Sequence, residues 1–194
     1  MDVKIIKSAK IYQGRFLSFF RDDIILKKKV KAIREYMDHP PAVGIIPFID
    51  KDTIVMVEQY RYANDLVSLE IPAGKVNRQE ELKKGALREM EEEIGYTAAM
   101  SDLIPFYTYT PAISYSREKL TLFIARNLKK TDQNPDEDEM IKVKIFKLNQ
   151  IEEMIKKNKI MDSKTVMAIL LYQMLKSRNL TFSGGHEREK RYES

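Results

Sequence analysis

The chain has 194 residues, carries a net charge of +5, and is 43% hydrophobic and 32% charged. This length supports one sizeable hydrophobic core. With no cysteine and only two histidines, the sequence excludes disulfides, thiolate zinc sites and a cysteine nucleophile, so we expect any metal site to use oxygen ligands.

No apolar run approaches the length that spans a bilayer, and the N-terminal residues lack the hydrophobic segment of a signal peptide. We therefore expect a cytoplasmic protein. The positive charge favours an anionic substrate, but the basic residues are scattered and are not interleaved with aromatic residues as in nucleic-acid-binding proteins. The expected partner is a small phosphorylated molecule, not a nucleic acid or a membrane.

The N-terminal region predicts a small sheet. From Val3 to about Tyr36 the residues alternate loosely between apolar and charged types, which indicates three strands with little to bury. The segment His39-Pro40-Pro41 then breaks the pattern. We therefore expect residues 1–40 to form an antiparallel β-sheet subdomain and residues 41–180 to form the main domain.

The main domain begins with two strongly apolar strands, at 42–49 and 53–61, which the turn at 50–52 joins as a hairpin or as neighbouring central strands. A short strand in SLEIPAG follows. A helix is predicted from Glu80 to Ile94, with Gly95 as the left-handed residue that ends it.

Strands are then expected at 120–128 and 141–148, and helices at 149–158 and 163–177, the second of them capped by Asp162 or Ser163. Strands and helices that mix without regular alternation predict an α+β fold of stacked layers. Residues 181–194 combine Gly-Gly with dense charge, so we expect a flexible tail.

The predicted helix from Glu80 to Ile94 has an acidic face beside its apolar stripe. Residues three and four apart share a helix face, so Glu89, Glu92 and Glu93 project together. Such a face is either a solvated surface or a cation site. Its confinement next to the apolar stripe, and the carbonyls of the preceding Pro-Ala-Gly turn, favour Mg²⁺, with Mn²⁺ as a substitute.

The stretch from Gly74 to Tyr96 resembles the Nudix box, G-x5-E-x7-R-E-U-x-E-E-x-G-U, in which U is a bulky apolar residue. The residues on its fixed positions are Gly74, Glu80, Arg88, Glu89, Met90, Glu92, Glu93, Gly95 and Tyr96. Only the last is unusual, because an aliphatic residue is common there. The resemblance covers roughly residues 42–178 and implies the Nudix fold, a mixed β-sheet sandwiched between α-helices.

The resemblance also implies an activity, the hydrolysis of a nucleoside diphosphate linked to another group X. By position, Glu89 and Glu93 would be the main metal ligands, and Glu92 and the carbonyl of Ala73 would complete the set. Arg88 would orient the glutamates by ion pairing.

Residues outside the box are similar to the ADP-ribose pyrophosphatase branch of this family. They are the EQYR segment at 58–61, the LEIPAG segment at 69–74, Pro111, and the acidic DEDE segment at 136–139. The branch implies Mg²⁺-dependent hydrolysis of ADP-ribose to AMP and ribose 5-phosphate. It also implies a homodimer that shares the N-terminal sheets.

The branch assigns substrate contacts, and each has a plain alternative. Arg61 either binds the diphosphate through two hydrogen bonds or is an ordinary arginine at a strand end. Glu70 either accepts from a ribose hydroxyl or pairs with Arg61. Arg15 and Phe16 match positions that contact the adenine, although Phe16 is equally explained by packing on the sheet.

Three further assignments come from position in the same branch. Arg34 and Glu35 would reach into the active site of the partner subunit, or they are simply exposed strand residues. Pro111 begins a loop that is longer than usual and lacks the usual glycine, and this loop lies near the terminal ribose in the family. The loop therefore leaves the identity of group X open.

The general base is expected in the acidic segment, at Glu137, with Glu139 as the alternative if the register differs by two residues. A solvated hairpin is the plain explanation of the same acidic run. Two other functions remain: a Nudix pyrophosphatase for another nucleotide sugar or a dinucleotide, and a non-catalytic sensor that binds ADP-ribose. The intact box favours an enzyme.

Overall fold

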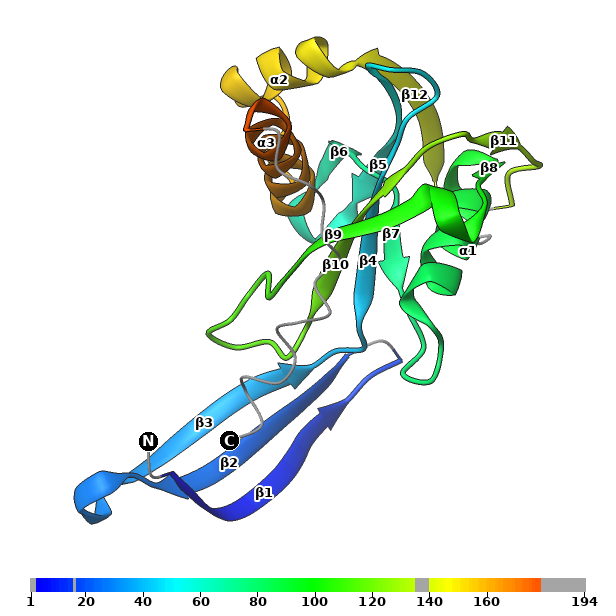
Figure 1. The fold of residues 1–194 in the computed structure, drawn as a ribbon. Coiled ribbons are helices and arrows are strands. Elements are labelled where there is room, and N and C mark those ends of the chain that lie inside the picture. Colours follow the sequence, from blue (N-terminus) through cyan, green and yellow to red (C-terminus); the bar gives the residue numbers. More distant parts are fainter. Residues whose placement is uncertain (1–2, 16, 135–139, 179–194) are drawn as a thin grey trace.

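The computed structural model describes residues 3–15, 17–134 and 140–178, and the three predicted N-terminal strands are all present (Figure 1). They are β1 (Lys4–Gln13), β2 (Ser18–Ile25) and β3 (Lys31–Asp38), with a short 3-10 turn at Lys27–Lys29. They form an antiparallel sheet in the order β1-β2-β3, which projects from the rest of the molecule (Figure 1). Most of its side chains are exposed, as the charge-rich sequence predicts.

Among the described residues, the main domain contains two larger sheets. The first has the order β7-β4-β10-β9 and the second the order β12-β5-β6. Their strands are β4 (Ala42–Pro47), β5 (Thr53–Arg61), β6 (Leu66–Glu70), β7 (Ala73–Lys75), β9 (Leu103–Tyr109), β10 (Leu120–Ala125) and β12 (Ile141–Lys147). Strand β4 runs parallel to β10 and antiparallel to β7, while β5 is antiparallel to both of its neighbours.

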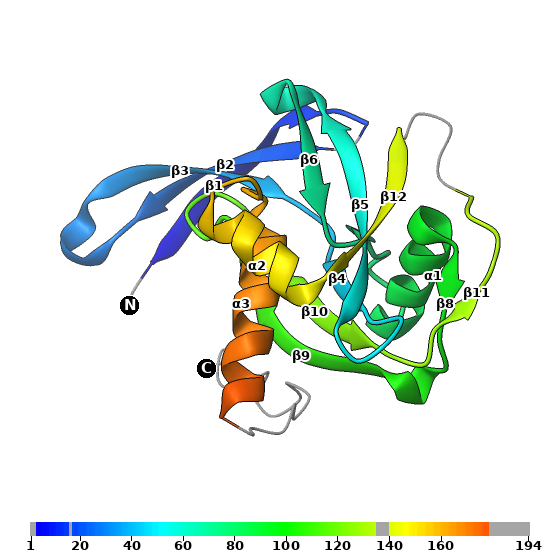
Figure 2. The same ribbon diagram turned by 90° about the horizontal axis from the view of Figure 1, so that it is seen from above.

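In the described part of the chain, three helices cover these sheets: α1 (Leu82–Ile94), α2 (Leu148–Lys156) and α3 (Ser163–Ser177). Figure 2 shows the sheets between α1 on one side and α2 with α3 on the other. Short segments complete the fold, namely β8 (Tyr96–Thr97), β11 (Lys129–Lys130) and the 3-10 turns at Tyr62–Asn64 and Met100–Asp102. The predicted α+β arrangement of layers is confirmed.

The central strands are mostly apolar because both of their faces are buried. In β5, Ile54 and Met56 belong to the hydrophobic cluster that includes α2 and α3, whereas Val55 and Val57 belong to the cluster that includes α1. Successive side chains of a strand point to opposite faces, so each helical layer receives alternate residues. This explains why the sequence shows a continuous apolar run.

The predicted pairing of β4 with β5 is wrong, because the two strands lie in different sheets. Strand β4 already has β10 and β7 on its edges, and β5 already has β12 and β6. The turn between them links only their ends, where the N–H of Ile49 donates to the carbonyl of Thr53 over 3.0 Å. Strand β9 was not predicted at all. It lies at a sheet edge, where Pro105 is tolerated although it interrupts the sequence signal.

The helix ends follow the predicted signals. Helix α1 ends at Gly95, whose φ angle of 66° is left-handed, and α3 begins at Asp162, whose side chain accepts from the N–H of Thr165 over 3.0 Å. Within the described ranges, no helix is long and apolar enough to cross a membrane. The predicted tail at 181–194 lies outside the described residues.

The end of α1 provides a test of this local geometry. Replacing Gly95 by alanine should lower the free energy of unfolding by about 1–2 kcal/mol, because an L side chain disfavours a positive φ angle. Its Cβ would also lie 3.1 Å from the carbonyl oxygen of Thr131. Urea unfolding of Gly95→Ala and Gly95→Asn measures this effect. Asparagine tolerates the left-handed region, so it should lose less stability, and equal losses would contradict the explanation.

Candidate active site

The acidic face of α1 packs against β7 through two close contacts. The N–H of Ala73 donates to Oε2 of Glu93 over 2.9 Å, and Glu93 is only 4% exposed. A Cβ atom at Gly74 would lie 2.0 Å from Oε2 of Glu89. Only glycine fits at this position while Glu89 stays in place, so the Pro-Ala-Gly turn lies directly against the acidic face.

Arg88 holds the outer part of this face. Its Nη1 lies 2.9 Å from Oε1 of Glu89 and 2.8 Å from Oε2 of Glu92, and its Nη2 donates to the carbonyl of Lys75 over 3.0 Å. Glu80 contributes a longer ion pair of 3.4 Å. Burial disfavours the charged guanidinium, but these carboxylates outweigh it and raise the pKa of Arg88 above its usual value.

The three glutamates offer the oxygen ligands that a hard divalent cation prefers, next to the backbone of Ala73 and Gly74. Among the residues described, no three acidic or histidine side chains are already arranged as a metal centre. Arg88 and the N–H of Ala73 hold the glutamates instead. The donor set and the close approach of Gly74 fit a cation, and its binding would replace part of these contacts.

The acidic segment that contains Glu137 and Glu139 lies outside the described residues, but the chain that leads into it is attached to α1. The side-chain amide of Gln133 donates to the carbonyl of Glu93 over 2.7 Å, and the N–H of Asn134 donates to the carbonyl of Glu92 over 3.1 Å. Gln133 and Asn134 therefore lie beside the C-terminal turn of the acidic helix.

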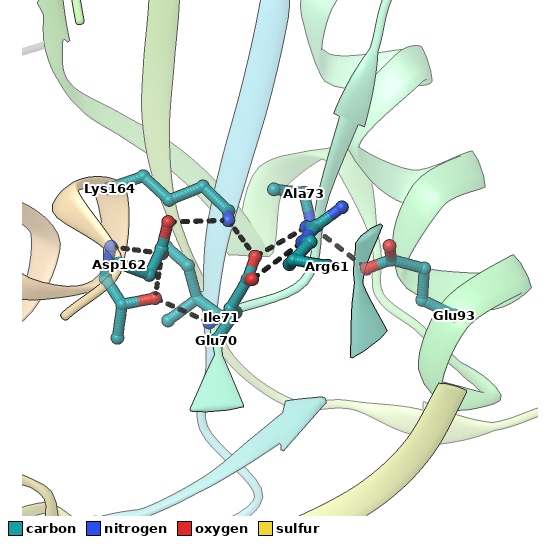
Figure 3. A network of polar contacts seen from close by, with 8 residues as sticks. Arg61, Glu70, Ile71, Ala73, Glu93, Asp162 and Lys164 are labelled. Atoms are coloured by element: carbon teal, nitrogen blue, oxygen red, sulfur yellow. Dashed lines mark hydrogen bonds and ion pairs between the residues drawn. The ribbon is translucent and has the colours of Figure 1, made fainter. Parts of the chain in front are cut away.

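A second polar cluster surrounds Glu70 at the end of β6 (Figure 3). Arg61 donates to both carboxylate oxygens of Glu70, over 2.8 Å and 2.6 Å, and Lys164 donates to Oε2 of the same group. The pairing of Glu70 with Arg61, one of the two alternatives for Glu70, is therefore present. Burial opposes ionisation of Glu70, but Arg61 and Lys164 outweigh it and lower its pKa from 4.5 to about 2.

A cavity of about 470 Å³ opens beside this cluster. Its lining includes Arg61, Lys159 and Lys164 together with Glu70 and Asp162. Cations outnumber carboxylates among these side chains, which suits an anionic ligand.

The other predicted contacts are spread over the N-terminal sheet and one loop. Arg15 lies in the turn between β1 and β2, and Arg34 and Glu35 are exposed on β3. Phe16 lies outside the described residues. Pro111 is exposed at the start of the loop between β9 and β10. Within a single chain, Arg34 and Glu35 lie away from the acidic face of α1, because β3 belongs to the projecting sheet (Figure 1).

Sequence reasoning missed Lys164 and assigned Asp162 only a capping role. Both side chains are largely buried and paired, with Nζ of Lys164 lying 3.1 Å from Oδ1 of Asp162. The one available signal was the predicted cap of the last helix. It indicates where α3 starts but not that this start lies against Glu70, which is 94 residues from Lys164.

The buried charge of Glu70 predicts a loss of stability in acid. Because the pKa of about 2 in the folded chain lies below the ordinary 4.5, the unfolded chain takes up the proton first as the pH falls. The stabilisation, on the order of 3 kcal/mol, is complete above about pH 4.5 and is lost as the pH falls through about 2.

Denaturant titrations of wild type and Glu70→Gln between pH 7 and pH 2 test this prediction. The variant should be less stable at pH 7, and the difference should shrink below pH 4.5. Glu153→Gln is a matched control, since Glu153 is exposed and pairs with Lys156 across the helix surface. A difference for Glu70→Gln that stays constant over the whole range would disprove the linkage.

Comparison with known proteins agrees with this geometry. The family model described as NUDIX domain matches residues 38–168. The chain is 35% identical over 173 residues to the methanol dehydrogenase activator of Bacillus methanolicus, covering 88% of this chain and 92% of that protein. It is 32% identical over 177 residues to the ADP-ribose pyrophosphatase of Bacillus subtilis (strain 168), covering 90% and 94%.

The fold has a solved counterpart in the crystal structure of an ADP compounds hydrolase. The TM-score is 0.81 at 22% identity, covering 93% of this chain and 98% of that one. This likeness confirms the predicted fold of mixed sheets between helices. With the family model matching 131 residues (38 to 168) of the 194, and with Glu89 and Glu93 of the box packed on Gly74 and Ala73, the chain belongs to the Nudix family.

Proposed function

We propose that the protein hydrolyses the diphosphate of ADP-ribose to AMP and ribose 5-phosphate in a Mg²⁺-dependent reaction. The observation that carries the proposal is the complete acidic face of α1, with Glu89 and Glu93 packed on the backbone of Ala73 and Gly74. The relatives named ADP-ribose pyrophosphatase and ADP compounds hydrolase support the same substrate class.

In this proposal Glu89 and Glu93 hold Mg²⁺, and Glu92 and the carbonyl of Ala73 complete the ligand set. Bound Mg²⁺ would neutralise phosphate oxygens and lower the pKa of the attacking water. Arg88 keeps the carboxylates oriented, because its guanidinium contacts both Glu89 and Glu92.

Arg61 is proposed to contact the diphosphate. Glu70 occupies the Nε and Nη2 edge of its guanidinium, so a phosphate oxygen would approach the Nη1 edge. The cavity beside it, with its excess of cations, supports an anionic ligand there. Pairing with Glu70 also holds the guanidinium in one orientation, which lowers the entropy cost of binding the substrate.

Substrate turnover tests the function and the metal site together. We expect wild type to cleave ADP-ribose with Mg²⁺ and not after chelation. Glu89→Gln and Glu93→Gln should each lower kcat by more than about a hundredfold, because the charge stabilisation from a bound metal is worth several kcal/mol. Glu91→Gln is the matched control, since Glu91 is exposed on the same helix.

Each contrary result would contradict a different part of this proposal. Wild-type rates in Glu89→Gln and Glu93→Gln at saturating Mg²⁺ would remove the metal assignment. If an intact wild type ignores ADP-ribose but cleaves another nucleotide sugar or a dinucleotide in a substrate panel, the chemistry stands and group X changes. If it binds ADP-ribose and cleaves nothing in the panel, the protein is a sensor.

Glu137 is proposed as the general base, with Glu139 as the alternative. Gln133 and Asn134 bring the preceding chain to the end of α1, which supports a base that approaches the metal helix from this segment. Glu137→Gln should lower kcat by roughly two to four orders of magnitude and leave Mn²⁺ affinity unchanged. If Glu139→Gln loses activity instead, the register differs by two residues, and if both stay active the segment is only surface.

A homodimer is the proposed assembly, with residues 1–40 of each chain against the other. The projecting sheet exposes large apolar side chains that water would otherwise contact, among them Ile5 (58% exposed), Ile6 (55%), Ile11 (53%) and Ile33 (49%). Arg15, Phe16, Arg34 and Glu35 would then contact the substrate, and Pro111 would lie near its terminal ribose. The cytoplasmic location inferred from the sequence stays a prediction.

Light scattering at micromolar concentration tests the assembly. The expected mass is that of two chains, and Ile5→Lys should shift the protein to a monomer with lower activity, because a charge in the apolar contact opposes pairing. Lys7→Glu, a charge change at an exposed residue of the same strand, serves as a control for general charge effects. A fully active wild-type monomer would contradict the proposal.

A further inference from the structure

The first turn of α3 holds the chain segment between β6 and β7 through buried hydrogen bonds (Figure 3). Oγ1 of Thr165, a residue with no exposed surface, accepts from the N–H of Ile71 over 2.9 Å. The same hydroxyl donates to Oδ2 of Asp162 over 2.6 Å. One buried hydroxyl therefore joins the start of α3 to the backbone of Ile71.

Lys164 joins the same two elements through charge. Its ammonium group pairs with Oδ1 of Asp162 over 3.1 Å and also contacts Oε2 of Glu70. The Lys164 side chain is 13% exposed and that of Glu70 is 3% exposed. Because Arg61 donates to both oxygens of the same carboxylate, Glu70 is held by β5 and by α3 at once.

The other end of this segment is part of the proposed metal site. The N–H of Ala73 donates to Glu93, and the carbonyl of Pro72 accepts from Ile45 of β4 over 2.9 Å. Only one residue separates Ile71 from Ala73. Since peptide units are rigid planes and consecutive Cα atoms lie about 3.8 Å apart, a shift of the Ile71 backbone moves Ala73.

We propose that Thr165 and Lys164 are positioning residues of the active site. By holding Glu70 and Ile71, they keep the backbone of Ala73 and the carboxylate of Glu93 at the spacing that a divalent cation requires. This inference rests on the proposed function, because it takes Ala73 and Glu93 as metal ligands. Both residues lie far from the box in sequence, and they act through the segment instead of touching the cation.

Outer contacts of this kind matter because they set the orientation of the metal ligands. Loss of such a contact typically costs about 10–100-fold in metal affinity or activity. A residue with only a structural role would lower the melting temperature without changing the affinity of the folded protein for a metal. Metal affinity in the absence of substrate therefore separates the two roles.

The experiment titrates the full chain with Mn²⁺, followed by electron paramagnetic resonance, at a temperature where every variant is folded. Thr165→Val removes the hydroxyl with little change in volume and should weaken Mn²⁺ binding by about tenfold or more. Thr165→Ser keeps the hydroxyl and should restore the wild-type Kd. Ile169→Val is the control, because Ile169 is buried in the same helix outside this hydrogen-bonded network.

Lys164→Met provides a second variant if Thr165→Val does not fold. It should also weaken Mn²⁺ binding, and Lys164→Arg should recover most of the affinity. In ADP-ribose turnover, Thr165→Val should lower kcat more than it raises KM. Wild-type Mn²⁺ affinity in Thr165→Val or, where that variant fails to fold, in Lys164→Met would overturn the positioning role.

The outcomes also separate this inference from the proposed function. A wild type that binds Mn²⁺ but leaves ADP-ribose intact would refute the substrate alone, and the Mn²⁺ affinities of the variants would still decide the positioning role. A wild type that binds no Mn²⁺ would refute both.

Discussion

The contact between β7 and α1 is the constraint on which the rest of the site depends. The carboxylate of Glu89 lies where a side chain at residue 74 would start, and Glu93 accepts from the N–H of Ala73. Both carboxylates are thereby removed from much of the surrounding water, which costs free energy. Hydrogen bonds and the ion pair with Arg88 offset this cost. Glu89 and Glu93 are thus part of the packing between a helix and a strand, not a wet surface.

The layers around this contact make it rigid. Both faces of β4, β5 and β10 are buried, one against α1 and the other against α2 and α3. Close-packed interiors transmit small displacements instead of absorbing them. We therefore expect a change at the start of α3, next to the cluster of Arg61, Glu70 and Lys164, to reach the proposed metal site.

The projecting sheet differs from the main domain because strand pairing, and not side-chain burial, accounts for most of its contacts. Its strands are well paired along β1, β2 and β3, yet the sheet buries few side chains. It joins the main domain through backbone hydrogen bonds between Met37 and the loop after Pro111, of 2.7 Å and 3.0 Å, and through Arg117, which lies 4.2 Å from the ring centre of Tyr36. The loop that lies near group X in the family thus contacts the strand that carries Arg34 and Glu35.

The sequence by itself determined the features with local signals. Alternating residues predicted the three N-terminal strands, the spacing of the glutamates predicted their common face on α1, and Gly95 ended that helix where only a left-handed residue fits. Tertiary structure alone decided the sheet partners of β4 and β5, because an apolar strand indicates burial but does not specify its neighbour. It also decided the pairing of Glu70 with Lys164, residues 94 positions apart. Such a pair leaves no periodic trace in the sequence, since it forms only after the layers bring the two chain segments together and exclude water from both charges.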